Sequence, residues 1–268
     1  MQSMRLNPVA PGHVRCSGDV LRQLMRAFIV LLGLAGVVWA LVNFSAFWRQ
    51  AGIEQIASEI LDHETFKPKA LDPFISTLAE IEQSRYCQPK LLRSAATIRL
   101  RLAEEAIAFA EHDVVDDRLS ALENGIRSAL GCEPADAFLW MVLAWADNAR
   151  EGPKPEQLTF LRLSYRLGPN EGWIAVRRNR LLLATFPRLP PDLAAAAVGE
   201  FGRMLDSWLY WEAIAIFTGP GWPIRDRLLV SLRDVGERQR EAFAKQLYAE
   251  GYDVIVPGIA RREPRPWY

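Results

Sequence analysis

The sequence predicts an all-α protein in which one N-terminal transmembrane helix is followed by stacked antiparallel helical hairpins. Residues 27–48 contain no charged side chain, most of the remaining chain has apolar residues at helical spacing, and one segment recurs after 35 residues. The expected organisation is a cytoplasmic tail at 1–22, a transmembrane helix at 23–48, a juxtamembrane helix and linker at 49–70, a helical domain at 71–250 and a C-terminal tail at 251–268.

The uncharged stretch is long enough to cross a bilayer. Its 22 residues span roughly 33 Å at about 1.5 Å per residue in a helix. Arg5, Arg15, Arg22 and Arg26 precede it, whereas Arg49 is the one basic residue that follows closely. This charge bias predicts a single-pass protein of the bacterial inner membrane, with a cytoplasmic N-terminus and a periplasmic C-terminal domain.

A cleaved signal peptide and a buried core helix are the alternatives to a membrane anchor. Signal peptides have a shorter apolar region, about 7–15 residues, followed by a site of small residues. Here the run is longer, and Asn43-Phe44-Ser45-Ala46 places a bulky residue beside each small one. An uncleaved anchor is therefore the preferred interpretation.

Composition limits the partners and the compartment. The chain has 32 Lys plus Arg and 32 Asp plus Glu. Nucleic-acid binding depends on clustered positive charge, so we expect no nucleic-acid partner. Cys87 and Cys132 both follow the apolar stretch. They can form a disulfide in an oxidising compartment, and two separately buried thiols are an equally open alternative.

Capping residues and apolar stripes divide the domain into helices. Asp72-Pro73 reads as a capping residue followed by proline at the first helical position. The juxtamembrane stripe from Ile53 to Leu61 forms one apolar face, which we expect to pack on the domain. Beyond the repeat discussed next, further helices are expected at 72–86, 89–112, 116–131, 171–186, 192–206, 208–217, 224–235 and 237–250.

The recurring segment lies in the middle of the chain. From Ala129 the sequence reads ALGCEPADAFLWMVLAWA, from Tyr165 it reads YRLGPNEGWIAVRRNRLLLA, and Pro134 falls 35 residues before Pro169. A period near 34 residues built of paired helices is typical of the tetratricopeptide repeat. The positions that match this family are Trp140, Leu143, Ala144, Leu161, Ser164 and the turn Leu167-Gly168-Pro169-Asn170.

The chain therefore resembles a degenerate tetratricopeptide-repeat protein over roughly residues 90–206. Asp147 and Gln157 depart from the family, which usually has tyrosine and alanine at these places. The resemblance implies a TPR-like α-solenoid with a groove for a protein partner. The layout also resembles membrane-anchored accessory proteins of bacterial exopolysaccharide biosynthesis clusters, which implies a role in polysaccharide synthesis or export and partners among those envelope components.

Tryptophans and arginines are the notable side chains of the domain. Trp140, Trp145, Trp208 and Trp211 are expected in the core. Trp222, in the rigid loop 219–223, is expected to cover the core, with exposed recognition as the alternative. The weak candidates for partner binding are Arg162, Arg166, Arg177, Arg180 and Trp222. Arg177 and Arg180 share one helical face, and a solvated face with local glutamate partners is the alternative for these arginines.

The sequence predicts no catalytic, cofactor-binding or metal-binding site. It contains no HExxH, Gly-rich phosphate loop, Gly-x-Ser-x-Gly or paired-cysteine zinc spacing. His112 and Asp113 are adjacent on an expected helix and would point about 100° apart, so they would not converge on one ion. We therefore expect no enzyme.

Three functions from different classes stay open at this stage. The preferred one is a membrane-anchored periplasmic scaffold or interaction protein. The alternative is a small structural subunit of a larger membrane complex that acts through its transmembrane helix, where Gly36 and Ala40 could form a small-xxx-small face. An enzyme would need at least two convergent acid, base or nucleophilic groups, and His112, Asp113 and Asp116 are its only candidates.

Overall fold

The computed structural model describes residues 16–62, 66–109, 112–152 and 154–260. All regular secondary structure among these residues is helical, and they contain no strand. The all-α class predicted from the sequence is thus confirmed for this part of the chain. The chain divides after Gln55 into two compact units, and the second unit begins at Ile56.

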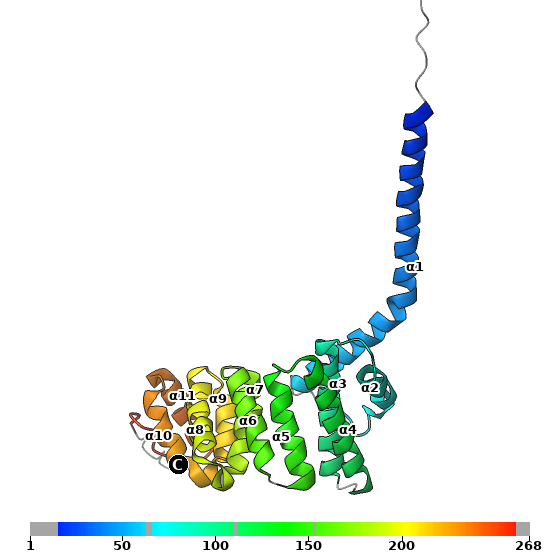
Figure 1. Cartoon of the computed structure of the whole chain (residues 1–268). Coiled ribbons are helices and arrows are strands. Elements are labelled where there is room, and N and C mark those ends of the chain that lie inside the picture. The colour runs from blue at the N-terminus through cyan, green and yellow to red at the C-terminus, as the bar shows by residue number, and fades with distance from the viewer. Residues whose placement is uncertain (1–15, 63–65, 110–111, 153, 261–268) are drawn as a thin grey trace, which may run out of the picture. The chain divides into compact units, whose positions relative to one another are not determined.

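Helix α1, Cys16–Leu61, is the first element (Figure 1). It contains Leu21–Val42, the one helical stretch among the described residues that is long and apolar enough to cross a membrane. The last residues of α1 belong to the second unit. There Ala57 is buried and Leu61 packs against the core formed by α3, α4 and α5.

The second unit continues with a succession of helices that lie side by side (Figure 1). Packing joins α3 to α4, α4 to α5, α5 to α6 and α7 to α8. Their bounds are η1 Asp72–Phe74, α2 Ile75–Glu82, α3 Pro89–Ala108, α4 His112–Cys132, α5 Ala137–Glu151, α6 Pro155–Leu167, α7 Gly172–Ala184, η2 Phe186–Arg188, α8 Pro191–Asp206, α9 Tyr210–Thr218, η3 Trp222–Ile224, α10 Arg225–Ser231, η4 Leu232–Asp234 and α11 Glu237–Ala249.

Local chemistry explains several of these helix starts. The Asp136 carboxylate accepts from the backbone N–H groups of Phe138 and Leu139, at 3.0 and 3.1 Å, and so caps α5. Proline occupies the first position of α3, α6 and α8, where its missing N–H leaves no bond unmade. Helix α4 begins at His112, four residues before the start expected at residue 116.

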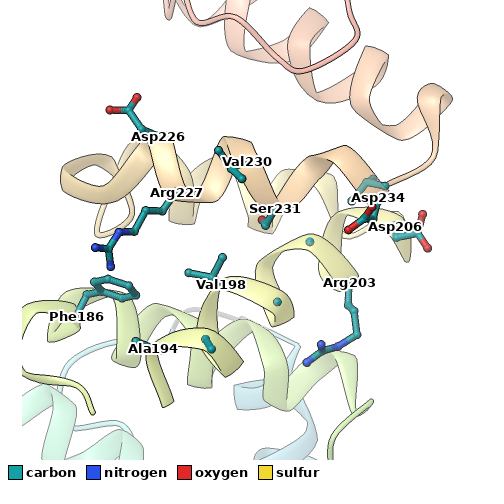
Figure 2. Close-up of a pocket in the computed structure, with 14 residues that line it drawn as sticks. Phe186, Ala194, Val198, Arg203, Asp206, Asp226, Arg227, Val230, Ser231 and Asp234 are labelled. Atoms are coloured by element: carbon teal, nitrogen blue, oxygen red, sulfur yellow. The ribbon is translucent and has the colours of Figure 1, made fainter. Parts of the chain in front are cut away.

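A hollow of about 830 Å³ lies between α8 and α10. Figure 2 shows Ala194 and Val198 of α8 facing Val230 and Ser231 of α10 across it. At one end the guanidinium of Arg227 lies over the Phe186 ring, 5.7 Å from its centroid. Because small side chains line α8 here, part of the space between the two helices stays open.

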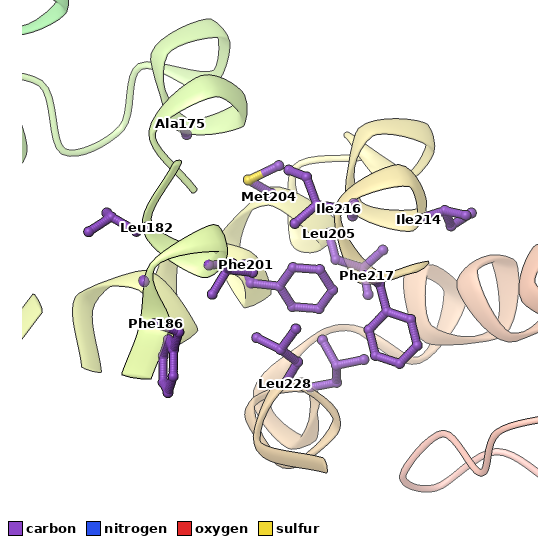
Figure 3. Close-up of a cluster of buried hydrophobic side chains, with 14 of the residues drawn as sticks. Ala175, Leu182, Phe186, Phe201, Met204, Leu205, Ile214, Ile216, Phe217 and Leu228 are labelled. Carbon is purple, nitrogen blue, oxygen red and sulfur yellow. The ribbon is translucent and has the colours of Figure 1, made fainter. Parts of the chain in front are cut away.

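Among the described residues, the core consists of two hydrophobic clusters. One is centred on α3, α4 and α5, and the other joins residues from α5 to the segment after α11. In the second cluster the rings of Phe201, Phe217 and Phe243 pack together, with centroids 5.4 to 6.1 Å apart. Figure 3 shows Phe201 and Phe217 near Leu228 of α10. Each of these aromatic rings is fully buried, so they dominate the packing of α8, α9 and α11.

Trp222 covers this second cluster, as predicted from the sequence. Its half-buried ring packs edge-on against Phe217 at 5.8 Å and contacts Tyr252 at 5.2 Å. The prediction that Trp208 and Trp211 belong to the core is wrong, because both side chains are 54% exposed. They lie in the turn after α8 and in the first turn of α9, where helical spacing does not indicate which side chains face inward.

Candidate functional site

The candidate site is a groove of about 550 Å³ in the second unit. Three helices of the repeat region, α3, α5 and α7, line it together with Ile60 and Leu61 from the end of α1. We use "the groove" for this cavity throughout. It brings together residues whose positions in the sequence differ by more than 100, so no local motif could have revealed it.

Apolar side chains form the floor of the groove. Leu100 of α3 and Met141 and Val142 of α5 are buried beneath it, and Leu181 of α7 is half-buried. Trp145 stands at the side of the groove, half-buried against the core of α3, α4 and α5. A segment that entered the groove would therefore meet an apolar surface with an aromatic ring beside it.

Charged side chains surround this floor with an excess of positive charge. The charged residues that line the groove in the described part of the chain are Arg101, Glu104, Arg177 and Arg180. Arg101 Nη1 lies 3.7 Å from Glu104 Oε2. Arg180 is exposed and makes no hydrogen bond or ion pair with any described residue. The groove therefore offers an uncompensated guanidinium, which favours carboxylate ligands.

Desolvation shifts the pKa values of two charged residues that line the groove, Glu104 and Arg177. Partial desolvation raises the pKa of Glu104, whose side chain stays 44% exposed, and the nearby positive charges of Arg101 and Arg177 oppose this shift. Burial also lowers the pKa of Arg177, although a guanidinium stays charged in proteins. Protonation of Glu104 would remove the one carboxylate among the described residues that line the groove.

Arg177 connects the groove to α1. Its Nη2 atom donates to the Leu61 carbonyl at 3.3 Å, and its Nη1 atom donates to the Trp173 carbonyl at 3.4 Å. Leu61 is the last residue of α1, where unpaired carbonyls carry partial negative charge. Arg177 thus stabilises the end of α1 against the wall of the groove.

Arg162 and Arg166, the other two predicted arginines, lie outside the groove. Both belong to α6 and are exposed. Arg162 donates through Nε to Asp192 Oδ2 at 2.7 Å, which links α6 to α8. The four arginines therefore do not form one patch, and the groove has Arg177 and Arg180 alone from that set.

Arg178 was not foreseen as an interior residue. Its guanidinium is fully buried and donates to Glu200, Ser164 and the Gly168 carbonyl, with the shortest contact 2.6 Å to Glu200 Oε1. The Tyr165 hydroxyl donates to Glu200 Oε2 at 2.8 Å. Burial and the negative charge of Glu200 hold the pKa of Tyr165 well above its usual range.

The structure joins Cys87 and Cys132 in a disulfide, with the two Cα atoms 5.6 Å apart. This separation is ordinary for a disulfide. The bond connects the segment before α3 to the last residue of α4. It therefore links the segment that leads into α3, a helix that lines the groove, to the end of α4.

Of the acid–base candidates that the sequence offered, Asp116 alone has a described side chain. The side chains of His112 and Asp113 lie outside the described part. Asp116 Oδ1 accepts from Arg150 Nε at 3.2 Å. Among the described residues, no group of three or more His, Cys, Asp or Glu could hold a metal ion.

The hollow between α8 and α10 is larger than the groove but differs in charge. Arg203 and Arg227 are balanced there by three acidic residues, Asp206, Asp226 and Asp234. Its sides are small residues of α8 and the exposed Val230. It has no excess positive charge like that of the groove, so the groove is the better candidate for binding an acidic segment.

Comparison with known proteins gives no relative: no family model, no curated protein and no solved structure matches this chain.

Proposed function

We propose that this chain is a membrane-anchored scaffold whose helical domain binds an acidic segment of a partner protein in the groove. The observation that carries the proposal is Arg180, an exposed guanidinium without an ion-pair partner among the described residues, beside an apolar floor and Trp145. Aromatic and arginine side chains are the residue types that most often dominate binding energy at protein interfaces.

We further propose a TPR-like architecture for the domain. Its support is the 35-residue period, the packing of α3 with α4, α5 with α6 and α7 with α8, and the position of the groove on alternate helices. Stacked helix pairs of this kind bury a continuous core and leave an extended surface for a partner. The groove would be that surface.

The proposed location is the bacterial inner membrane, with the N-terminus in the cytoplasm and the domain in the periplasm. Arg22 and Arg26 near the start of the apolar helix support this orientation. The disulfide between Cys87 and Cys132 supports an oxidising compartment for the domain. An accessory role in exopolysaccharide synthesis or export is the function that this layout supports best.

The test is photocrosslinking in cells from Ala184, an exposed residue of the groove. A photoreactive amino acid at this position should capture a specific envelope protein, and mass spectrometry identifies it. Arg180→Glu in the same chain should abolish the crosslink, because it replaces attraction of the partner's carboxylates by repulsion. The matched control is Arg166→Glu, which makes the same charge change on the exposed face of α6, outside the groove.

Two results would contradict the proposal. Equal crosslinking in the Arg180→Glu and Arg166→Glu variants would show that the groove does not select the partner. Loss of function when residues 21–42 are replaced by an unrelated transmembrane helix, with the crosslink retained, would favour the alternative of a structural subunit that acts through its membrane helix. The scaffold proposal expects function to survive that replacement.

A further inference from the structure

Helices α8 and α11 end in the same hydrogen-bonded turn. After α8, the Trp208 N–H donates to the Leu205 carbonyl at 3.1 Å and the Leu209 N–H donates to the Met204 carbonyl at 3.0 Å. After α11, Gly251 donates to Tyr248 at 3.1 Å and Tyr252 donates to Leu247 at 2.9 Å. This pair of bonds is the Schellman motif, in which one residue adopts a left-handed conformation.

Only one of the two turns has the residue that this conformation favours. Gly251 occupies the left-handed position after α11 with φ 89°, whereas Trp208 occupies the equivalent position after α8 with φ 64°. An L side chain is strained here because its Cβ crowds the following backbone, and glycine avoids the strain. A bulky residue at such a position is a reason to look for a function.

Although its backbone is strained, Trp208 keeps a large part of its side chain exposed. The side chain is 54% exposed and lines a cavity of about 550 Å³, together with Tyr248 and Tyr252 from the end of α11. Trp222 packs against Tyr252 with ring centroids 5.2 Å apart, so Tyr252 is supported from the core side. The two turns thus place three aromatic residues around one cavity, which we call the Trp208 cavity.

The positive and negative charges of the residues that line the Trp208 cavity are equal in number. In the described part of the chain they are Arg238, Lys245, Glu241 and Asp253, two of each sign. This balance gives no preference for a polyanion or a polycation. It does supply both strong donors and strong acceptors beside aromatic rings.

We propose that the Trp208 cavity binds a neutral oligosaccharide. One face of a pyranose ring presents C–H groups that pack on the negative face of an aromatic ring. The hydroxyl groups around the same ring both donate and accept hydrogen bonds, which matches the carboxylates, ammonium and guanidinium of this cavity. The cavity is separate from the groove in its residues, so the inference does not depend on the proposed protein partner.

The experiment uses the full-length chain in an amine-oxide detergent, because detergents with sugar headgroups would compete for the site. The probes are tetramers to hexamers of glucose, mannose, galactose and N-acetylglucosamine, with uronic-acid oligomers and deca-proline for comparison. Isothermal titration should show at least one neutral oligosaccharide with a Kd of about 1 mM or lower. Trp208→Ala and Trp208→Gly should each weaken it roughly tenfold or more, and Trp208→Phe should retain most of it.

Stability measurements separate loss of binding from loss of folding. Trp208→Gly should melt at a higher temperature than Trp208→Ala, because only glycine is unstrained at this turn. The matched control is Trp211→Ala, which removes a tryptophan of equal exposure that does not line the cavity and should leave binding unchanged. The proposal is overturned if no neutral oligosaccharide binds below about 5 mM, if Trp208→Gly binds like wild type, or if uronic acids or deca-proline alone bind.

Discussion

Arg178 of α7 and Glu200 of α8 form an ion pair in the interior, with Nη2 of the arginine 2.6 Å from Oε1 of the glutamate and both side chains at most 1% exposed. Arg177 and Arg180, on the same helix, line the groove. A rotation of α7 by one residue would bring Arg178 out of this pair. The buried pair therefore fixes which arginines of α7 face the groove.

Breaking this pair should be strongly destabilising. Glu200→Gln or Arg178→Met leaves the other charge buried without its partner, which typically costs about 3–5 kcal/mol of unfolding free energy. For a unit of this size, that loss corresponds to a melting temperature lower by roughly 10 °C. Circular dichroism of the purified chain during heating measures it.

The double variant Arg178→Met with Glu200→Leu is the matched control for the broken pair. Replacing both partners by apolar residues removes the buried charges together, so most of the lost stability should return. The interpretation fails if the single variants unfold within about 1 kcal/mol of wild type, since that result would place the pair in contact with water. Recovery of stability without recovery of the Ala184 crosslink would support its role in orienting α7.

The disulfide should stabilise the domain substantially. Cys87 and Cys132 are separated by 45 positions, for which the chain-entropy model gives roughly 4 kcal/mol. Cys87→Ser, Cys132→Ser and their combination should lower the melting temperature by the same amount, because each removes the same bond. Reductant should lower wild type to that level and leave the variants unchanged. Additive losses in the double variant would disprove the bond.

Groove binding should strengthen as the pH falls. Burial raises the pKa of Glu104, so this carboxylate gains a proton at a higher pH than an ordinary glutamate and the groove becomes more positive. A cysteic-acid pentapeptide is a suitable probe, because its sulfonates stay ionised between pH 5 and pH 8, and titration should show tighter binding at the acidic end. Glu104→Gln should bind more tightly at pH 7 and lose most of this pH dependence.

Glu156→Gln is the control for that experiment. Glu156 is exposed on α6 and does not line the groove, so its neutralisation should leave both the affinity and its pH dependence nearly unchanged. A response equal to that of Glu104→Gln would mean that the net charge of the domain, rather than the groove, controls the affinity.

Asp147 should reduce stability at neutral pH. Burial and then the negative charge of Glu123 raise its pKa above the ordinary value of 3.8. For a carboxyl group whose folded-state pKa is raised, ionisation opposes folding, and the penalty disappears as the pH falls below the pKa of the unfolded chain. Asp147→Asn should therefore melt at a higher temperature than wild type at pH 7, with the difference vanishing below about pH 3.8. An unchanged difference across this range would contradict it.

The sequence allowed the helices to be predicted more reliably than the site. Proline opens α3 and α8 because its missing N–H is not needed there, and the Asp136 carboxylate caps α5. The apolar stretch in α1 was equally clear. These features depend on neighbours within a few residues, so they needed no knowledge of the folded domain.

The side-chain positions that matter most depend on distant contacts. Arg178 has the same local setting as Arg177 and Arg180, and only its distant partner Glu200 explains its burial. Trp208 was assigned to the core because apolar spacing does not indicate where a helix ends in a left-handed turn. The groove combines α1 with α7, and the sequence contains no signal for that approach.

The bond between Cys87 and Cys132 closes the chain that contains α3 and α4 into one covalent ring. A protease that cuts the connection between these helices would open the ring without releasing either fragment. The cleaved protein would run as a single band on a non-reducing gel and as two bands after reduction. Arg101 and Glu104 of α3 would stay tethered to α4 after the cut.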